Sequence, residues 1–350
     1  MQLVWFTRKK IRNEGLLGIE FGPEGIALAN VLRTPGEVPR LNHCEFRAAP
    51  ASEQPALLKA MVAELGLDGL PVNLVLHPAT YQMLLLDSPE VAPEELRDAM
   101  RWRVKELISE PLDQVVVDAF PLPADAYRGR SRMAYCAVLG KAEMQRWGEM
   151  IRHAGLRLGS IDVTEMAFRN LGLLAGADGM NLALLRLRST EGLICVQHGA
   201  DLYMARRIEH GLEQAGQEFS TVTLEIQRSL DYFESQLGKG YINRLLLLPM
   251  KRDGSAALQA LGSGLAVKLQ ALDLRELFVE QPAADLDEQQ QAYCITAVGA
   301  ALRQEALKVP GTMMERLGLT RAQVTELHTS MMGLIAATSG QETEPEPAVE

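Results

Sequence analysis

Three short apolar runs, each bounded by turn residues, open the chain. They cover residues 16–21, 26–33 and 41–46. Gly-Pro-Glu-Gly and Thr-Pro-Gly separate them. Short apolar runs between glycine and proline turns are typical of strands, so this stretch predicts an antiparallel meander.

The same order of elements returns in the second half of the chain. After the first meander come a helix pattern at 53–65 and an apolar strand pattern at 72–76. The second set has three strand patterns, then a helix and a strand, at residues 181–187, 193–197, 202–208, 220–237 and 242–248. This repetition predicts an internally duplicated α/β unit and therefore two lobes, as the length of 350 residues also favours.

A separate block of elements interrupts the first unit. Its patterns predict strands at residues 81–86, 114–120 and 132–139 and helices at 94–108 and 142–153. The first helix is entered at Pro93, and the second is closed by Gly155. A strand at 157–161 and a helix to 174 then resume the unit. We therefore divide the chain into the segments 1–15, 16–178 with an inserted block, 179–338 and 339–350.

The ends of the chain differ from the rest in composition. In the segment 1–15, the apolar and aromatic residues 3–6 are followed by basic ones at 8–10 and 12, and this segment is either a frayed terminus or a weak contact with anionic lipid. A last helix pattern begins at Arg321. The acidic tail 339–350 has no apolar periodicity, so we expect it to be disordered.

Charge and residue spacing exclude several classes of protein. A net charge of −10 argues against a nucleic-acid binder and favours a basic protein partner. The four cysteines and six histidines are scattered, so neither a metal site nor a catalytic triad is predicted. No apolar stretch is long enough to span a membrane, so we expect a cytoplasmic protein.

Four segments resemble the PilM family of type IV pilus assembly, and within it the branch of MSHA pilus biogenesis. They lie at residues 100–118, 157–162, 225–233 and 297–303. The resemblance implies an α/β actin-like (ribonuclease H-like) two-lobe fold with an inserted subdomain, at about 76–150, in the first lobe. It also implies a place at the inner face of the bacterial inner membrane, where a bitopic PilN-like protein docks its cytoplasmic N-terminus.

The first phosphate-binding turn implied by this resemblance keeps its glycines but little else. The family pattern is Gly-Ile-Asp-Ile-Gly followed by small hydroxyl residues and a lysine. Here Gly18 and Gly22 flank Glu20, whereas Pro23 removes an amide donor and Glu24 adds a negative charge. Ordinary hairpin geometry also explains the two glycines.

The second turn has lost its aspartate. Arg186 and Arg188 stand where the family pattern has Asp-Ile-Gly, so backbone approach to a phosphate is hindered, although both arginines can attract an anion. We therefore expect a non-catalytic scaffold with no catalytic residue, metal or cofactor. The alternative is a weak ATPase that binds Mg·ATP through Glu20 and the arginines.

A partner surface is predicted on the helix at 94–108. Leu96, Met100, Val104, Leu107 and Ile108 share its apolar face. Trp102 falls on another side, with the acids Glu95, Asp98 and Glu106. An exposed tryptophan beside acids suits a basic peptide, as a PilN-like N-terminus is expected to be. The alternative is that Trp102 packs under a neighbouring strand.

Overall fold

The computed structural model describes residues 14–34, 37–127, 132–177, 179–215, 219–251, 254–278 and 285–304. The predictions for residues 1–13, for the helix from Arg321 and for the acidic tail lie outside the described residues. The chain divides into two compact units, residues 1–303 and 304–350, and the described helices and strands belong to the first.

The first unit contains two five-stranded sheets of the same topology. The first has the order β3-β2-β1-β4-β8, with strands β1 (Leu16–Phe21), β2 (Gly25–Leu32), β3 (Arg40–Ala48), β4 (Pro71–Leu76) and β8 (Arg157–Val163). Strands β1, β2 and β3 are antiparallel, whereas β4 and β8 run parallel to β1. This is the predicted meander extended by crossover strands.

The second sheet repeats that arrangement. Its order is β11-β10-β9-β12-β13, with β9 (Asn181–Leu187), β10 (Gly192–His198), β11 (Asp201–Ile208), β12 (Arg244–Leu247) and β13 (Leu269–Ala271). Strand β9 again pairs with an antiparallel neighbour on one side and a parallel one on the other. The predicted duplication is confirmed.

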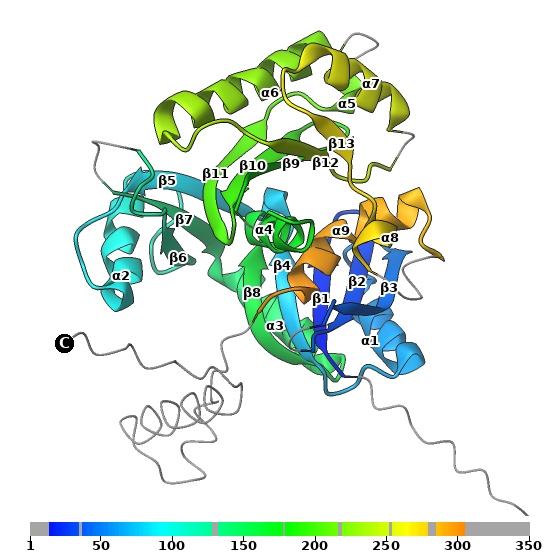
Figure 1. Ribbon diagram of the computed structural model, residues 1–350. Helices are drawn as coiled ribbons and strands as arrows, with labels where there is room; N and C mark the ends of the chain where they lie inside the picture. The colour runs from blue at the N-terminus through cyan, green and yellow to red at the C-terminus, as the bar shows by residue number, and fades with distance from the viewer. Residues whose placement is uncertain are drawn as a thin grey trace, which may run out of the picture. The chain divides into compact units, whose positions relative to one another are not determined.

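Helices cover both faces of both sheets (Figure 1). Helices α4 (Thr164–Leu174) and α9 (Glu288–Ala301) lie between the sheets, in a core shared by β2 and β9. Helices α1 (Gln54–Leu65) and α3 (Lys141–His153) cover the outer face of the first sheet. The outer face of the second is covered by α6 (Ser220–Tyr232), continued by the π-turn η2 (Phe233–Leu237), and by α7 (Ser255–Gly264). The short helices are α5 (Leu212–Ala215), α8 (Leu274–Leu277) and the 3-10 turn η1 (Pro78–Thr80).

Helix α9 belongs to the first lobe by packing, although it comes after the whole second sheet in sequence. It packs on β1, β2, β3 and β4 and alongside α4. Its N-terminus is held by a capping box in which Asp287 and Gln290 bond each other's backbone. The chain therefore returns to the first lobe after completing the second, which periodicity alone does not reveal.

The inserted block forms a third sheet of order β5-β7-β6. Its strands are β5 (Tyr81–Asp87), β6 (Val115–Pro121) and β7 (Met133–Gly140), all antiparallel, and α2 (Pro93–Val104) packs on one face. The other face contacts the second lobe, where the Tyr135 hydroxyl accepts from the amide of Ala205 at 2.8 Å. The insertion therefore contacts the second lobe as well as extending from the first.

Candidate functional site

A cleft of about 660 Å³ opens between the two duplicated turns. It is bordered by the β1–β2 turn, the β9–β10 turn, the segment after β12 and the N-terminal half of α9. Both predicted phosphate turns thus face each other, as the duplication requires. Each turn satisfies its own backbone: the Gly22 amide donates to the Gly25 carbonyl at 2.9 Å, and the Arg188 amide to the Glu191 carbonyl at 2.7 Å.

The two glycines predicted for nucleotide binding have different surroundings. Gly22 lines the cleft, where an added Cβ would lie 3.8 Å from its nearest neighbour. Gly18 does not line it. A Cβ at Gly18 would lie 1.9 Å from the carbonyl oxygen of Ala297, so this glycine permits the close approach of α9 to β1. Gly18 is a packing residue here.

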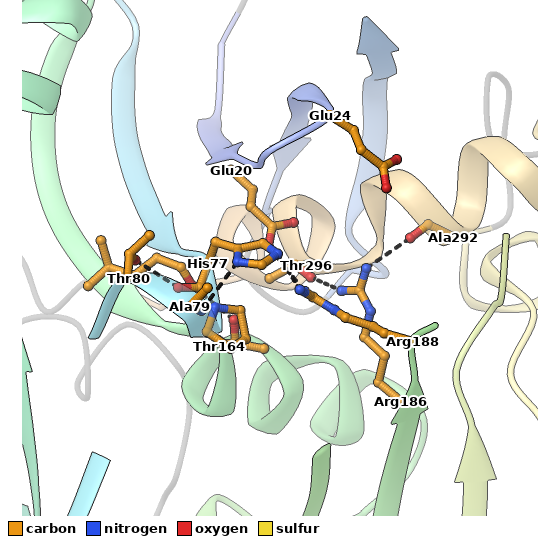
Figure 2. A network of polar contacts seen from close by, with 12 residues as sticks. Glu20, Glu24, His77, Ala79, Thr80, Thr164, Arg186, Arg188, Ala292 and Thr296 are labelled. Carbon is orange, nitrogen blue, oxygen red and sulfur yellow. Dashed lines mark hydrogen bonds and ion pairs between the residues drawn. The ribbon is translucent and has the colours of Figure 1, made fainter. Parts of the chain in front are cut away.

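Glu20 and Arg188 meet inside the cleft. Nη2 of Arg188 lies 3.6 Å from Oε1 of Glu20, an ion pair without a hydrogen bond. Arg188 also contacts Nε2 of His77, the residue that follows β4 (Figure 2). Both partners come from the first lobe, so the guanidinium crosses the cleft.

Arg186 crosses the cleft as well but is more deeply buried. Its guanidinium donates to the carbonyl of Ala292 at 3.1 Å and contacts the hydroxyl of Thr296, both on α9 (Figure 2). Burial lowers the pKa of this arginine to about 9. The sequence predicts open anion sites at Arg186 and Arg188, whereas the structure gives both of them partners within the chain.

His77 was not singled out from the sequence. Its ring nitrogens face two N–H donors, Arg188 at Nε2 and the Ala79 amide at Nδ1, 3.3 Å away. Burial and four nearby cations lower its pKa to about 3. His77 is therefore neutral at physiological pH. A histidine directly after a buried strand was the only signal, and it gave no hint of the arginine.

Two further cations reach across the cleft. Lys251, in the segment after β12, pairs with Glu24 at 2.5 Å and lies 4.3 Å from the ring centre of Tyr293. The hydrogen bond from Lys251 lowers the pKa of the Glu24 carboxyl. Arg207 on β11 donates to the carbonyl of Pro78 at 2.5 Å. Neither Lys251 nor Arg207 could be linked to the cleft from spacing alone.

Within the described residues no group of three or more His, Cys, Asp or Glu side chains is placed to hold a metal ion. The four cysteines carry no disulfide. No helix in the described part of the chain is both long and apolar enough to cross a membrane.

The predicted partner surface lies away from the cleft, on α2. Trp102 is 69% exposed, so the alternative that it packs under a strand is wrong. Lys105 lies 6.0 Å from the centre of its ring. The acids Glu95, Asp98 and Glu106 are also exposed, and Asp98 lies 3.6 Å from Arg97.

The predicted end of this helix is wrong, and with it one part of its predicted apolar face. Leu96, Met100 and Val104 are buried as expected, but α2 ends at Val104. Leu107 is 54% exposed because the chain has left the helix by then and no longer follows its periodicity. The large apolar side chains of Trp102 and Leu107 therefore both face solvent on this subdomain.

No family model and no curated protein sequence matches the chain. Among solved structures, it is similar to a PilM–PilN type IV pilus biogenesis complex, with a TM-score of 0.63 and 21% identity over 83% of this chain and 98% of that one. The chain has an actin-like fold.

Two further solved structures are more distant. A Bacteroides thetaiotaomicron protein with an actin-like ATPase fold matches at a TM-score of 0.46 and 11% identity, over 77% of this chain and 94% of that one. The cytoplasmic domain of EpsL, an inner-membrane component of the Vibrio cholerae type II secretion system, matches at 0.46 and 10%, over 85% and 99%. The two sheets of the same topology and the match to the PilM–PilN complex confirm the fold prediction, a two-lobe actin-like arrangement.

Proposed function

We propose that this protein is a non-catalytic scaffold of a type IV pilus or related secretion machine, acting on the cytoplasmic side of the inner membrane. Its sequence resembles MshI of MSHA pilus biogenesis among PilM-like proteins. The observation that carries the non-catalytic role is the contact between Arg188 and Glu20. In this contact the Glu20 carboxylate, which the weak-ATPase alternative needs for the metal, lies beside an internal cation.

The electrostatics of the cleft support the same role. A metal-assisted phosphoryl transfer needs acidic side chains that bind Mg²⁺ and backbone amides free to meet phosphate. Glu24, on the rim, is paired with Lys251, and the turn amides of Gly22 and Arg188 are already bonded. These groups are therefore not free to position a nucleotide and its metal.

ATP hydrolysis with and without Mg²⁺ tests this role directly. We expect no Mg²⁺-dependent turnover and no shift of the melting temperature when Mg·ATP is added. Glu20→Ala is the decisive variant, because turnover that this substitution abolishes would show a working site and overturn the proposal.

A weak ATPase is the second candidate, and one observation favours it. Glu20 is 5% exposed, and its Oε1 accepts no hydrogen bond from any described residue. A buried carboxylate oxygen without a donor is a potential metal ligand if Arg188 moves aside. Isothermal titration with Mg·ADP separates the candidates, because this one requires binding that Glu20→Gln weakens.

The proposed partner is a PilN-like bitopic protein whose basic N-terminal segment docks on α2. An exposed tryptophan beside carboxylates has the features of an interface anchor. Glu95, Asp98 and Glu106 supply the negative charge that a basic peptide would meet. A synthetic peptide of that segment, from the same operon, should bind wild type and fail to bind when its cations are replaced by alanine.

A further inference from the structure

We propose that the four cations Arg186, Arg188, Arg207 and Lys251 form a lock that holds the two lobes closed without a ligand. Each of these residues belongs to the second lobe, and each contacts an acceptor in the first lobe. Such a lock would act in the same way whichever partner the protein binds.

The inner half of the lock consists of Arg186 and Arg188. Arg186 on β9 is buried and meets the carbonyl of Ala292 at 3.1 Å on α9, which packs on the first sheet. Arg188, directly after β9, contacts His77 and lies 3.6 Å from Glu20 on β1. Arg186 is buried and Arg188 is only partly exposed, so their contacts are stronger than contacts at the open surface, and separating the lobes would break them.

The outer half lies nearer solvent. Lys251 pairs with Glu24 at 2.5 Å, with both side chains partly exposed. Arg207 donates to the Pro78 carbonyl at 2.5 Å, at the start of the connection to the inserted sheet. Exposed ion pairs are weak and screened by salt. We therefore expect this half to contribute little to the free energy of closure and to make closure depend on the salt concentration.

In all four cases the donor lies on the second lobe and the acceptor on the first. Every donor is a cation of the second lobe, and the acceptors are carboxylates, carbonyls, a hydroxyl and a neutral imidazole of the first. Among the described residues, the ion pairs that cross this cleft place the cation on the second lobe and the acid on the first. Such one-sided pairing, concentrated between two duplicated turns, is the arrangement expected of a closing device.

Distances between spin labels measure closure in the full-length protein. One label replaces the exposed Lys59 on α1 and the other the exposed Gln259 on α7, in a Cys44→Ser background. We expect one narrow distance distribution for the wild type. Arg188→Ala should broaden it toward longer distances, and the double variant Arg188→Ala, Lys251→Ala should broaden it further, while circular dichroism remains that of the wild type.

Two control variants separate the lock from ion pairs in general. Arg303 pairs with Asp162 at 2.8 Å within the first lobe, and Arg146 pairs with Glu143 on the surface of α3. Arg303→Ala and Arg146→Ala should leave the distribution narrow. If Arg188→Ala fails to fold, Lys251→Ala at low and high salt still tests the outer half.

An unchanged distribution in the folded double variant, at both salt concentrations, would overturn the proposal. The lobes would then be held by the shared apolar core and by the contact of Tyr135 with Ala205. That result would leave the scaffold role and the peptide-binding experiment unaffected, because neither has lobe closure as its readout.

Discussion

Side chains in the cleft between the lobes and side chains on the exposed flank of α2 have opposite surroundings. In the cleft, even strongly polar groups such as Arg186 find partners within the chain. On α2, Trp102 and Leu107 are left exposed to water, although exposing large apolar groups is unfavourable. The contrast teaches that contacts within the chain occupy the cleft between the duplicated turns, whereas the exposed apolar side chains to which we propose that a partner binds lie on the inserted subdomain.

The largest effect should come from adding a methyl group at Gly18. A Cβ there would lie 1.9 Å from a carbonyl oxygen of α9, so the helix that carries the Arg186 acceptors has to shift. We expect Gly18→Ala to lower the free energy of unfolding by about 3 kcal/mol. Urea denaturation measures it.

The matched control for this change is Gly22→Ala, just after the same strand, where an added Cβ would make only an ordinary contact at 3.8 Å. It should cost less than about 1 kcal/mol. Equal losses for the two variants would mean that the turn itself, and not the approach of α9, requires the glycines.

On the partner side, Trp102→Ala should weaken binding of the basic peptide by about 2 kcal/mol, roughly thirtyfold in Kd, because a central aromatic anchor is lost. The melting temperature should stay that of the wild type, since the side chain is 69% exposed. Fluorescence anisotropy of a labelled peptide measures the affinity. Leu224→Ala on α6 removes a comparably exposed apolar residue, 50% accessible, and should leave binding unchanged.

The cleft should also give the protein a dependence on pH. The folded pKa of His77 is about 3, below its ordinary value of 6.5, so the unfolded chain takes up a proton first as the pH falls. Stability is therefore lost progressively as the pH falls from about 6.5 toward 3, and the loss amounts to about 2 kcal/mol at pH 5. The opposing charges are Arg186, Arg188, Arg207 and Lys251.

Chemical denaturation at pH 7 and pH 5 tests this dependence. The wild type should lose about 2 kcal/mol more stability between the two than His77→Gln does. His153→Gln on the exposed side of α3 is the control and should behave like the wild type. A wild-type loss no greater than that of His77→Gln would show that the imidazole takes up its proton equally well in the folded protein.

The smallest effect should belong to the rim of the cleft. Lys251→Ala removes a partly exposed ion pair with Glu24, so we expect a loss of less than about 1 kcal/mol in low salt. At about 1 M salt the loss should nearly disappear because the charges are screened. A loss that persists there would assign the contribution of Lys251 to its packing on Tyr293.

Local pattern was enough to predict most of the elements and the repeat. Alternating apolar runs and glycine turns predicted both meanders, because strand formation and turn chemistry depend on neighbouring residues. Helical periodicity also placed Trp102 off the buried side of its helix, and the structure agrees. It failed at Leu107, where the helix had already ended.

What the sequence by itself determined, then, is the set of elements, their duplication and the residue types that stand at both turns. Only the tertiary structure decided that α9 returns to the first lobe, that Gly18 permits its close packing, and that Arg186 and Arg188 have partners within the chain. These are contacts between residues about 100 or more positions apart. Their formation depends on how the two sheets enclose α9. A local pattern of hydrophobic and polar residues does not show which residues so far apart in sequence will meet.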